Sequence, residues 1–438
     1  MAKEKFAIIG SGPSALVCAE ELLKHYAQVT MIGPDKSDTN SKFDIKNLRK
    51  FLAKDRFTKK NVYASFSREL QINQFGTNFL ETPIKGGLSE IWGGVCFPQH
   101  HSERKFLHIP ETDYISIMDE LIDYLKITNT TSDFWESFIN KNIKSGSFCG
   151  VPSMAIENGK IWSASKGIQS LQLKGLEFIR GEVVKIENEI NGVKITILNN
   201  NQYQTCFFDR IFIASGPVGD AKLILNSFPD LENISISDTA TEFHFLLKFN
   251  PHNKLQKDMR PIISGIFLND DKTLRTYVQV YPISAQLISS LPIRYVYNVF
   301  FPFFWLASKF IFLGMIFHPQ AYSRNFILTK INNGFESSVD EGELGQNEKW
   351  NNNQFKDFGY KTIFKSIKNK PGSGIHSGAF IPNDKFDYGR LTGLNIDFPN
   401  AHFIGASSLS ILPTGPITLT SLINSVYIVR RVMSDLLK

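Results

Sequence analysis

The sequence predicts an α/β fold, α+β overall, in which a discontinuous Rossmann-like domain carries an inserted domain built on an antiparallel sheet. Three observations lead to this prediction. An apolar run at residues 6–9 breaks into closely spaced glycines and then into a helical pattern. A hairpin pattern around Asn191 and Gly192 leads to a second buried strand at 209–213. Strand-like runs then follow one another between residues 242 and 280, as in an antiparallel sheet.

The first strand ends in a glycine-rich turn that is typical of dinucleotide binding. Gly10 allows the tight turn, Gly12 lets the backbone approach a pyrophosphate, and Ala15 is small enough for close packing of helix on strand. The helix predicted over 13–25 directs its positive N-terminal end toward the phosphates. Ordinary strand-to-helix turns can carry the same glycines, but a second apolar run at 28–32 follows at the spacing of a βαβ unit. The sequence therefore predicts a bound dinucleotide.

The acidic residue that often ends the second strand of this fold has no direct counterpart. Gly33 occupies that position, and Asp35 follows two residues later. Asp35 either reaches the ribose hydroxyls of the dinucleotide or is only a turn residue in Gly-Pro-Asp, and the sequence leaves both interpretations open.

The composition excludes several classes of protein. With 438 residues, of which 42% are hydrophobic and 21% charged, the chain is long enough for two or three folded domains. The net charge of +6 comes from scattered Lys and Arg, which argues against nucleic-acid binding but is compatible with an anionic small molecule or an anionic membrane surface. The four cysteines are far apart and form no CxxC pair, so we expect neither a metal site nor a disulfide framework.

Cysteine usage and the N-terminus favour a cytoplasmic location, with the inner face of the membrane as an alternative place of action. The basic and then apolar N-terminus resembles a signal peptide, but its apolar part is the nucleotide-binding strand, and Glu20 and Glu21 interrupt the helical segment after it. We expect no cleaved targeting segment and a reducing compartment.

We expect five segments along the chain. The dinucleotide-binding domain is formed by 1–110, 161–238 and 371–438, with a helical insertion at 111–160 and a substrate domain at 239–370 that contains an antiparallel sheet and an apolar helix.

Shorter patterns lie inside these segments. Apolar residues at helical spacing predict an amphipathic helix over 113–125, and a short helix is expected at 47–52 within a polar surface excursion. The polar, Asn-rich stretch 332–358 predicts an exposed loop or lid.

A second glycine-rich stretch at 85–94 brackets a serine and a tryptophan. Glycines carry no Cβ, so such a loop can bring backbone N–H groups close to a flat or anionic ligand. The alternative is a structural turn with the tryptophan in the core. The residues concerned are Gly86, Gly87, Ser89, Trp92, Gly93 and Gly94.

The apolar segment 295–317 raises the question of a membrane span. Asn298, Pro302 and Lys309 interrupt it, and it lies between two parts of one expected sheet, so we reject a transmembrane helix. It is interpreted as a buried or dimer-forming helix, with an interfacial helix that docks on a membrane and admits a lipid-linked substrate as the alternative.

The last seventy residues carry the second informative pattern. His376 stands among small residues, a strand is expected before Gly405, and the stretch from Leu412 opens a helix that runs to Val432. A strand that leads through a loop to a helix N-terminus offers another place to receive a cofactor.

Taken together, these motifs resemble the glucose-methanol-choline (GMC) family of FAD-dependent oxidoreductases, and in particular shorter GMC-like proteins of bacterial surface polysaccharide synthesis. The order of the four matching stretches along the chain is more specific than any one of them, whereas 239–360 matches no family motif. The stretches are 10–15, 86–94, 213–216, and 405–408 with Pro413 and Thr414. The resemblance implies FAD as cofactor, bound by Gly10, Gly12, Pro13, Ser14, Ala15, Asp35, Gly86, Gly87, Ser89, Trp92, Gly93, Gly94, Val184, Ser215, Gly216, Gly405, Ala406, Ser407 and Thr414.

The resemblance also implies the catalytic residues. His376 aligns with the family's active-site histidine and is expected to act as the base that takes the hydroxyl proton, since the pKa of a neutral histidine lies close to working pH. The family's second active-site His or Asn is missing, because Ile417 stands near that position. Thr418 is the remaining candidate and would donate a weaker hydrogen bond.

We therefore expect a flavoenzyme that oxidises a hydroxyl of a sugar or sugar-like substrate. Nucleotide-linked and lipid-linked forms of this substrate both stay open. A separate electron acceptor and a peripheral membrane contact through 295–317 are the expected partners. The missing partner of His376 keeps two alternatives open: a redox-neutral isomerase or reductase, and a non-catalytic flavin-binding protein.

Overall fold

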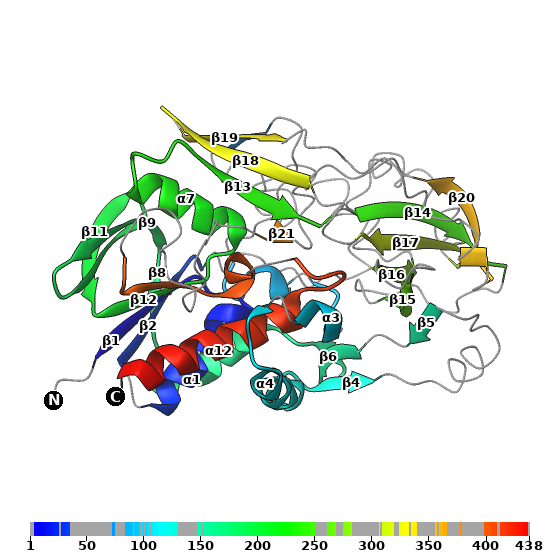
Figure 1. Cartoon of the computed structure of the whole chain (residues 1–438), viewed down its shortest axis with the longest axis horizontal. Coiled ribbons are helices and arrows are strands. Elements are labelled where there is room, and N and C mark those ends of the chain that lie inside the picture. Colours follow the sequence, from blue (N-terminus) through cyan, green and yellow to red (C-terminus); the bar gives the residue numbers. More distant parts are fainter. Residues whose placement is uncertain are drawn as a thin grey trace.

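The nucleotide-binding half of the molecule is organised around a five-stranded parallel sheet with the order β22-β12-β1-β2-β8 (Figure 1). Its strands are β1 (Lys5–Ile9), β2 (Gln28–Gly33), β8 (Glu177–Arg180), β12 (Arg210–Ile213) and β22 (Ala401–Phe403). The computed structural model describes residues 4–25, 28–35, 72–74, 84–90, 92–96, 99, 101–104, 107–129, 147–150, 153–239, 241–249, 261–268, 275–282, 306, 309–318, 324–332, 334–339, 355–356, 359–365, 377–378, 398–409 and 412–436. The five strands of this parallel sheet come from the first, middle and last parts of the chain.

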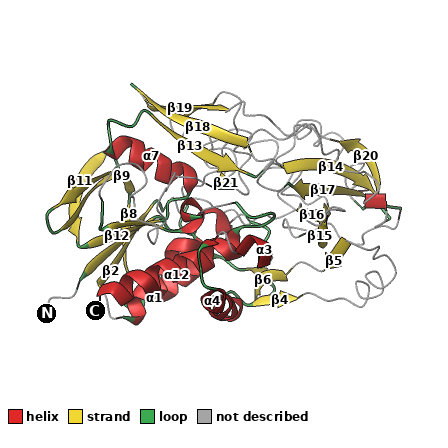
Figure 2. Cartoon of the chain, in the orientation of Figure 1, coloured by secondary structure: helices red, strands yellow, loops and turns green. Residues whose placement is uncertain are grey.

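Both faces of this sheet are covered, which explains why the inner residues of its central strands β1, β2 and β12 are buried on both sides. Helices α1 (Pro13–Lys24) and α12 (Thr418–Leu436) pack against each other on one face, together with α4 (Glu111–Tyr124) and α6 (Ala164–Gln172). The other face carries α7 (Pro217–Ser227) and an antiparallel sheet of β9 (Glu182–Glu189), β10 (Gly192–Asn199) and β11 (Gln202–Phe208), as Figure 2 shows. Alternate residues of β1 accordingly enter different cores, Phe6 and Ile8 on one side and Ala7 and Ile9 on the other.

Two further sheets form the other half of the molecule (Figure 1). The first has the order β21-β13-β18-β19-β3, with β3 (Ile72–Gln74), β13 (Asn233–Asp238), β18 (Arg324–Ile331), β19 (Gly334–Val339) and β21 (Ser377–Gly378). The second, here called the distal sheet, has the order β20-β14-β17-β16-β15-β5, with β5 (Ser147–Gly150), β14 (Thr241–Leu247), β15 (Ile263–Leu268), β16 (Arg275–Pro282), β17 (Ile311–Phe317) and β20 (Lys361–Lys365).

Several elements expected from the sequence are confirmed. The fold is α/β with a parallel sheet and inserted antiparallel sheets. The helix expected over 113–125 is α4, and Asn191 lies in the turn that joins β9 and β10. The strands expected between 242 and 280 are β14, β15 and β16.

The helix expected over 295–317 is wrong for its described part, because Ile311–Phe317 is the strand β17. This strand lies between β14 and β16 in the distal sheet, and both of its faces are buried. Phe312 and Ile316 enter one core and Leu313 and Met315 the other, so the strand is apolar at every position except Gly314. Residues 295–305 lie outside the described part. No helix in the described part of the chain is both long enough and apolar enough to cross a membrane.

Two other segments hold more strand than the sequence indicated. The segment 111–160 contains α4 but also β4 (Ile127–Asn129), β5, β6 (Ser153–Glu157) and part of β7 (Lys160–Ile161), and β5 pairs with β15 of the distal sheet. The stretch 332–358, expected to be a loop, contains β19. The short helix expected at 47–52 lies outside the described residues.

Candidate functional site

The end of β1 and the start of α1 form a turn that only glycine can make at one of its positions. Gly10 has a φ of +114°, and a Cβ there would lie 2.2 Å from the carbonyl oxygen of Ala214, at the end of β12. Gly12 caps α1 with ordinary backbone angles, no side chain caps this helix end, and a Cβ on Gly12 would meet no atom within 4 Å. The N-terminus of α1 therefore keeps free space in front of its first backbone N–H groups, as an anion requires.

The second glycine-rich stretch, residues 85–94, lies directly against this turn. A Cβ on Gly87 would lie 3.2 Å from the Cα of Gly12, so the backbones of the two segments are in close approach. The loop continues as a short 3-10 helix, η2 (Gly87–Glu90), which is fastened to the start of α6. The Ser89 hydroxyl donates to the carbonyl oxygen of Gly86 and accepts from the N–H of Ala164, at 2.7 and 3.0 Å.

Glu90 completes this fastening. Its Oε1 accepts hydrogen bonds from the Ser163 hydroxyl at 2.5 Å and from the N–H of Ser165 at 3.2 Å. Ser89 and Glu90 thus satisfy backbone N–H groups in the first turn of α6, where no intrahelical acceptor exists. Glu90 was not among the predicted site residues.

The C-terminal loop reaches the same helix end from the other side. Gly405 begins the short 3-10 helix η5 (Gly405–Ser408) with a φ of +79°, and a Cβ there would lie 3.0 Å from the hydroxyl oxygen of Ser14. The N–H of Gly405 donates to the Ser425 hydroxyl at 2.9 Å, and the Asn424 amide donates to Ser408 Oγ at 2.8 Å. Both partners lie on α12, so this helix fixes the loop against α1.

A buried carboxyl group lies between the end of β12 and η5. Asp220 lies in the first turn of α7 and is fully buried. Its Oδ1 accepts from the N–H and hydroxyl of Ser215, at 2.8 and 2.5 Å, and its Oδ2 accepts from the hydroxyl of Ser407 at 2.5 Å. Burial raises the pKa of Asp220 to about 6, although its hydrogen bonds from Ser215 and Ser407 act in the opposite direction.

Asp220 therefore connects the end of β12 to η5. Both serines were predicted site residues, and their hydroxyls bond to this carboxyl group. Gly216, between Ser215 and α7, has a φ of +84° and open space around its Cβ position.

The carboxyl end of β2 forms the other side of the turn. Gly10 N–H donates to the carbonyl oxygen of Ile32 at 2.7 Å, and the Gly33 carbonyl accepts from Gly181 N–H at 3.1 Å. Asp35 follows this strand and is half-buried, and Val184 is half-buried in β9, which begins directly after Gly181. Asp35 and Val184 thus follow neighbouring parallel strands at the same edge of the sheet.

Part of the second glycine-rich stretch turns toward the core. The Trp92 ring nitrogen donates to the carbonyl oxygen of Trp162 at 2.8 Å, and the two rings make an edge contact with centroids 6.2 Å apart. The Gly94 carbonyl accepts from the N–H of Ala155 at 2.8 Å. Of the two interpretations of Trp92, this position favours packing, and the half-buried Gly93 lies between it and Gly94.

The loop before α12 is almost completely buried. Thr414 N–H donates to Oε1 of Glu103 at 3.1 Å, and burial raises the pKa of Glu103. Ile417 is buried, and Thr418 is the half-buried first residue of α12. The side chain at Ile417, near which the motif resemblance led us to look for a second polar group, is therefore apolar and buried.

His376 lies outside the described residues. The next residue in the chain, Ser377, pairs with Asp238 as part of β21, and β21 contacts η5. Ala406 is half-buried within η5.

One face of the distal sheet meets this loop. A Cβ on Gly415 would lie 2.9 Å from Cγ of Tyr277, so the tyrosine ring lies against the loop backbone. Two residues along β16 the Gln279 amide donates to the Tyr277 hydroxyl at 3.3 Å, and two residues further Tyr281 donates its hydroxyl to Gln279 Oε1. We call these three residues the polar row. It runs along β16 from the loop outward and is buried among apolar side chains.

No family model and no curated protein matches the chain in sequence. Solved structures, in contrast, match the chain in fold. Pyridoxine 4-oxidase from Mesorbium loti matches with a TM-score of 0.65 at 14% identity over 99% of both chains. An FAD-dependent oxidoreductase from Chaetomium thermophilum matches with a TM-score of 0.57 at 13% identity, again over 99% of both chains.

The chain shares the fold of these two proteins. The likeness covers the distal sheet as well as the parallel sheet, although the middle of the sequence carried no motif. The structure thus brings together, around the N-terminus of α1, the glycine turn, Gly87 and Gly405. Glu90, Glu103 and Asp220 were missed, because each acts through partners that are distant in the chain. The polar row was missed because its contact with Gly415 joins two distant segments.

Proposed function

We propose that the chain is an FAD-dependent oxidoreductase that oxidises a hydroxyl group of a sugar or sugar-like substrate. The observation that carries the proposal is the meeting of three segments at the N-terminus of α1, where Gly87 lies against Gly12 and Gly405 lies against Ser14. A glycine turn at a helix N-terminus is a binding site for a pyrophosphate. FAD is the dinucleotide favoured by the likeness to an FAD-dependent oxidoreductase.

The residues at this site suit the cofactor. Gly12 has ordinary backbone angles and open space at its Cβ position, so the surrounding chain imposes no need for glycine there, whereas a pyrophosphate at the helix end does. Gly12, Pro13, Ser14 and Ala15 would hold the pyrophosphate, and Asp35 the adenosine ribose. FAD, when bound, supplies the hydride acceptor at its flavin N5.

The substrate would lie beside the contact between Tyr277 of the distal sheet and the loop before α12. The polar row offers hydroxyl and amide groups that orient a hydroxylated substrate, and its first member already contacts Gly415. His376 would take the hydroxyl proton, since it directly precedes the strand that contacts η5. A role in surface polysaccharide biosynthesis at the cytoplasmic face of the membrane completes the proposal and rests on the motif resemblance.

The test begins with the absorption spectrum of the purified protein before and after denaturation. A flavin spectrum that bleaches on anaerobic addition of one candidate sugar supports both the cofactor and the reaction. Absence of a flavin, together with failure to reconstitute one, would overturn the proposal.

Gly12→Ala tests the cofactor site with little effect on the stability of the fold. Loss of bound flavin is expected with a loss of stability of at most about 1 kcal/mol, because alanine is a slightly poorer helix cap than glycine. Gly159→Ala, in an open turn of the β6–β7 hairpin, is the matched control and should keep its flavin. Equal flavin content in both variants would contradict a pyrophosphate at Gly12.

The buried Ile417 favours a second candidate, a redox-neutral isomerase or a reductase, because it places an apolar side chain near the position where the resemblance implies a second His or Asn. Reduction of the flavin by NADPH without any sugar would select the reductase. Sugar-dependent bleaching that NADPH does not reproduce would select the oxidase.

A further inference from the structure

One end of the distal sheet lies far from the parallel sheet (Figure 1). The described residues at this end expose a group of large apolar side chains. We call the described residues there the distal end: 247–249, 306, 309–311, 355–356 and 359–365. Its exposed apolar side chains have relative accessibilities of 78% for Phe249, 53% for Leu306, 51% for Ile363 and 61% for Phe364.

Backbone hydrogen bonds show that these residues lie together. The N–H of Lys248 donates to the carbonyl oxygen of Phe310 at 2.9 Å, and Lys309 N–H donates to Leu306 at 3.2 Å. These bonds place the end of β14 beside the start of β17. The edge strand β20 pairs with β14, and its register shift leaves Ile363 unpaired between the partners of Phe245 and Leu246.

The charges at the distal end all have one sign. Its charged residues are lysines, and none of its described residues is Asp or Glu. Lys356 and Lys361 are exposed, and Lys248 is half-buried with its ammonium group 4.7 Å from the ring centre of Tyr360. The lysines are Lys248, Lys309, Lys356, Lys361 and Lys365.

Lysines on an edge strand also oppose pairing with another sheet, which gives Lys361 a simpler role. That role does not account for exposed Phe249, Leu306 and Phe364, which a solvated edge has no need to carry. Apolar and aromatic side chains surrounded by lysines are instead typical of a surface that enters the headgroup region of an anionic membrane.

We propose that the distal end is a docking surface for an anionic lipid membrane. The sequence had suggested membrane contact through a helix over 295–317, but the buried strand β17 cannot provide it. The contact instead uses the side chains at the rim of the sheet, with lysines on the phosphates and aromatic rings among the headgroups. This inference is independent of the proposed redox function.

The test is co-sedimentation of the full chain with vesicles of phosphatidylcholine, alone or with about 30% phosphatidylglycerol as the anionic lipid. We expect binding only to the anionic vesicles, and its loss when the salt concentration rises from roughly 0.1 M to 0.5 M. Phe249→Ser with Phe364→Ser, and separately Lys356→Glu with Lys361→Glu, should each weaken binding about tenfold or more.

Matched controls lie on exposed sites of the nucleotide-binding half. Leu173→Ser with Ile190→Ser removes two more exposed apolar side chains, and Lys160→Glu with Lys174→Glu reverses the same charge. Both controls should bind as the unchanged protein does. Each protein is first checked by its thermal unfolding midpoint, and if the serine pair does not fold, the lysine pair decides.

Three outcomes would overturn the inference. The unchanged protein does not sediment with anionic vesicles, or the controls lose binding as strongly as the distal-end variants. In the third, light scattering shows a dimer that Phe249→Ser with Phe364→Ser dissociates, which would assign this surface to a second copy of the chain.

Discussion

Gly10 and Gly159 differ in their surroundings, although both have a positive φ. At Gly10 a Cβ would overlap the carbonyl of Ala214, whereas at Gly159 it would meet no atom within 4 Å. Gly10→Ala should therefore lower the free energy of unfolding by about 3 kcal/mol or more, because strain and overlap add. Gly159→Ala should cost only about 1 kcal/mol. Urea unfolding of both variants measures this, and equal costs would show that β12 does not constrain the turn.

Asp220 makes stability depend on pH in a direction opposite to that of a paired surface carboxylate. Its pKa is about 6 in the folded chain and about 3.9 when unfolded, so between these values only the folded chain keeps the proton. Its contribution to stability is therefore full below pH ~4 and lost as pH rises toward ~6, by about 2–3 kcal/mol.

Asp220→Asn should remove this component. We expect the difference in unfolding free energy between the unchanged protein and the variant to fall as pH rises from ~4 to ~6. Urea titrations at several pH values measure it. A difference independent of pH would mean that the carboxyl group is ionised throughout.

The two kinds of site residue differ in how far the sequence could reveal them. Gly10, Gly12 and Ala15 form one local strand, turn and helix, so their spacing is visible in a single stretch. Asp220 bonds to Ser407, which is 187 residues away in the chain, and no local pattern announces such a contact.

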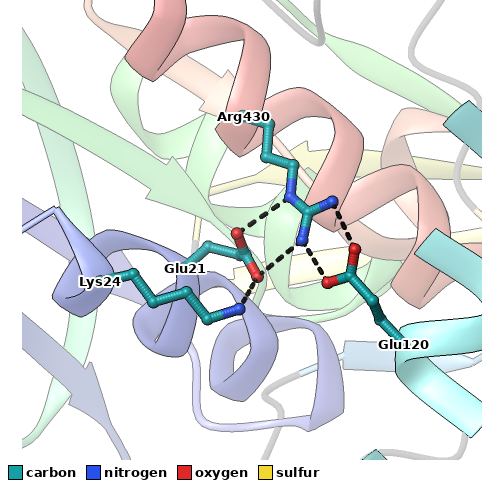
Figure 3. Close-up of polar contacts among 4 residues, drawn as sticks. All are labelled: Glu21, Lys24, Glu120 and Arg430. Atoms are coloured by element: carbon teal, nitrogen blue, oxygen red, sulfur yellow. Dashed lines mark hydrogen bonds and ion pairs between the residues drawn. The ribbon is translucent and has the colours of Figure 1, made fainter. Parts of the chain in front are cut away.

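Helices α1, α4 and α12 are joined by one charged group (Figure 3). Arg430 donates to both oxygens of Glu21, at 3.0 and 3.2 Å, and to both oxygens of Glu120, at 2.5 and 3.0 Å. Lys24 also contacts Glu21, at 2.5 Å. Burial by itself would raise the pKa of Glu21, but the hydrogen bonds from Arg430 and Lys24 outweigh it and lower the pKa.

Arg430→Met should lower the free energy of unfolding by about 1–2 kcal/mol, since it leaves the buried Glu21 with one cation and removes the link to α4. Lys24→Met should cost less than about 0.5 kcal/mol, because Lys24 is exposed and Arg430 remains. Thermal and urea unfolding at low and high salt distinguish them. A larger loss for Lys24→Met would contradict the assignment of Arg430 as the main link.

The segment 311–317 shows why element type was harder to predict than element position. A central strand buried on both faces is apolar at nearly every position, and a buried helix has the same composition. Gly314 was an available signal, because glycine inside a strand often marks close approach, and a Cβ there would lie 2.7 Å from the ring of Phe355.

Tyr277 of the distal sheet lies against Gly415 in the loop before α12. If the polar row orients the substrate, Tyr281→Phe should raise KM several-fold and leave the flavin spectrum and kcat nearly unchanged, because the change removes the donor to Gln279 Oε1 without touching the cofactor site. Its stability cost is expected to be about 1 kcal/mol. Steady-state kinetics measure the effect, with the exposed Tyr203→Phe as control. A fall in kcat with KM unchanged would indicate a role in the chemical step instead.

At this scale the sequence predicted the class of fold but not how the halves are assembled. The parallel sheet was visible because its strands carry glycine motifs at their ends. The pairings of β5 with β15 and of β3 with β19 join segments far apart in the chain, and neither strand has a pattern that names its partner.

The edge strand β22 is the last strand of the parallel sheet along the chain. Gly405, which follows it, lies against Ser14 at the start of α1, so one site is built from the first and last parts of the chain. A ribosome that makes this protein exposes α1 long before it releases α12. Until then the helix end around Ser14 lacks its C-terminal cover, and the apolar face of α1 lacks the helix that packs on it. If the site binds a nucleotide as proposed, binding should therefore follow synthesis of α12, and newly made protein is most exposed to chaperones and proteases in the interval before α12 emerges.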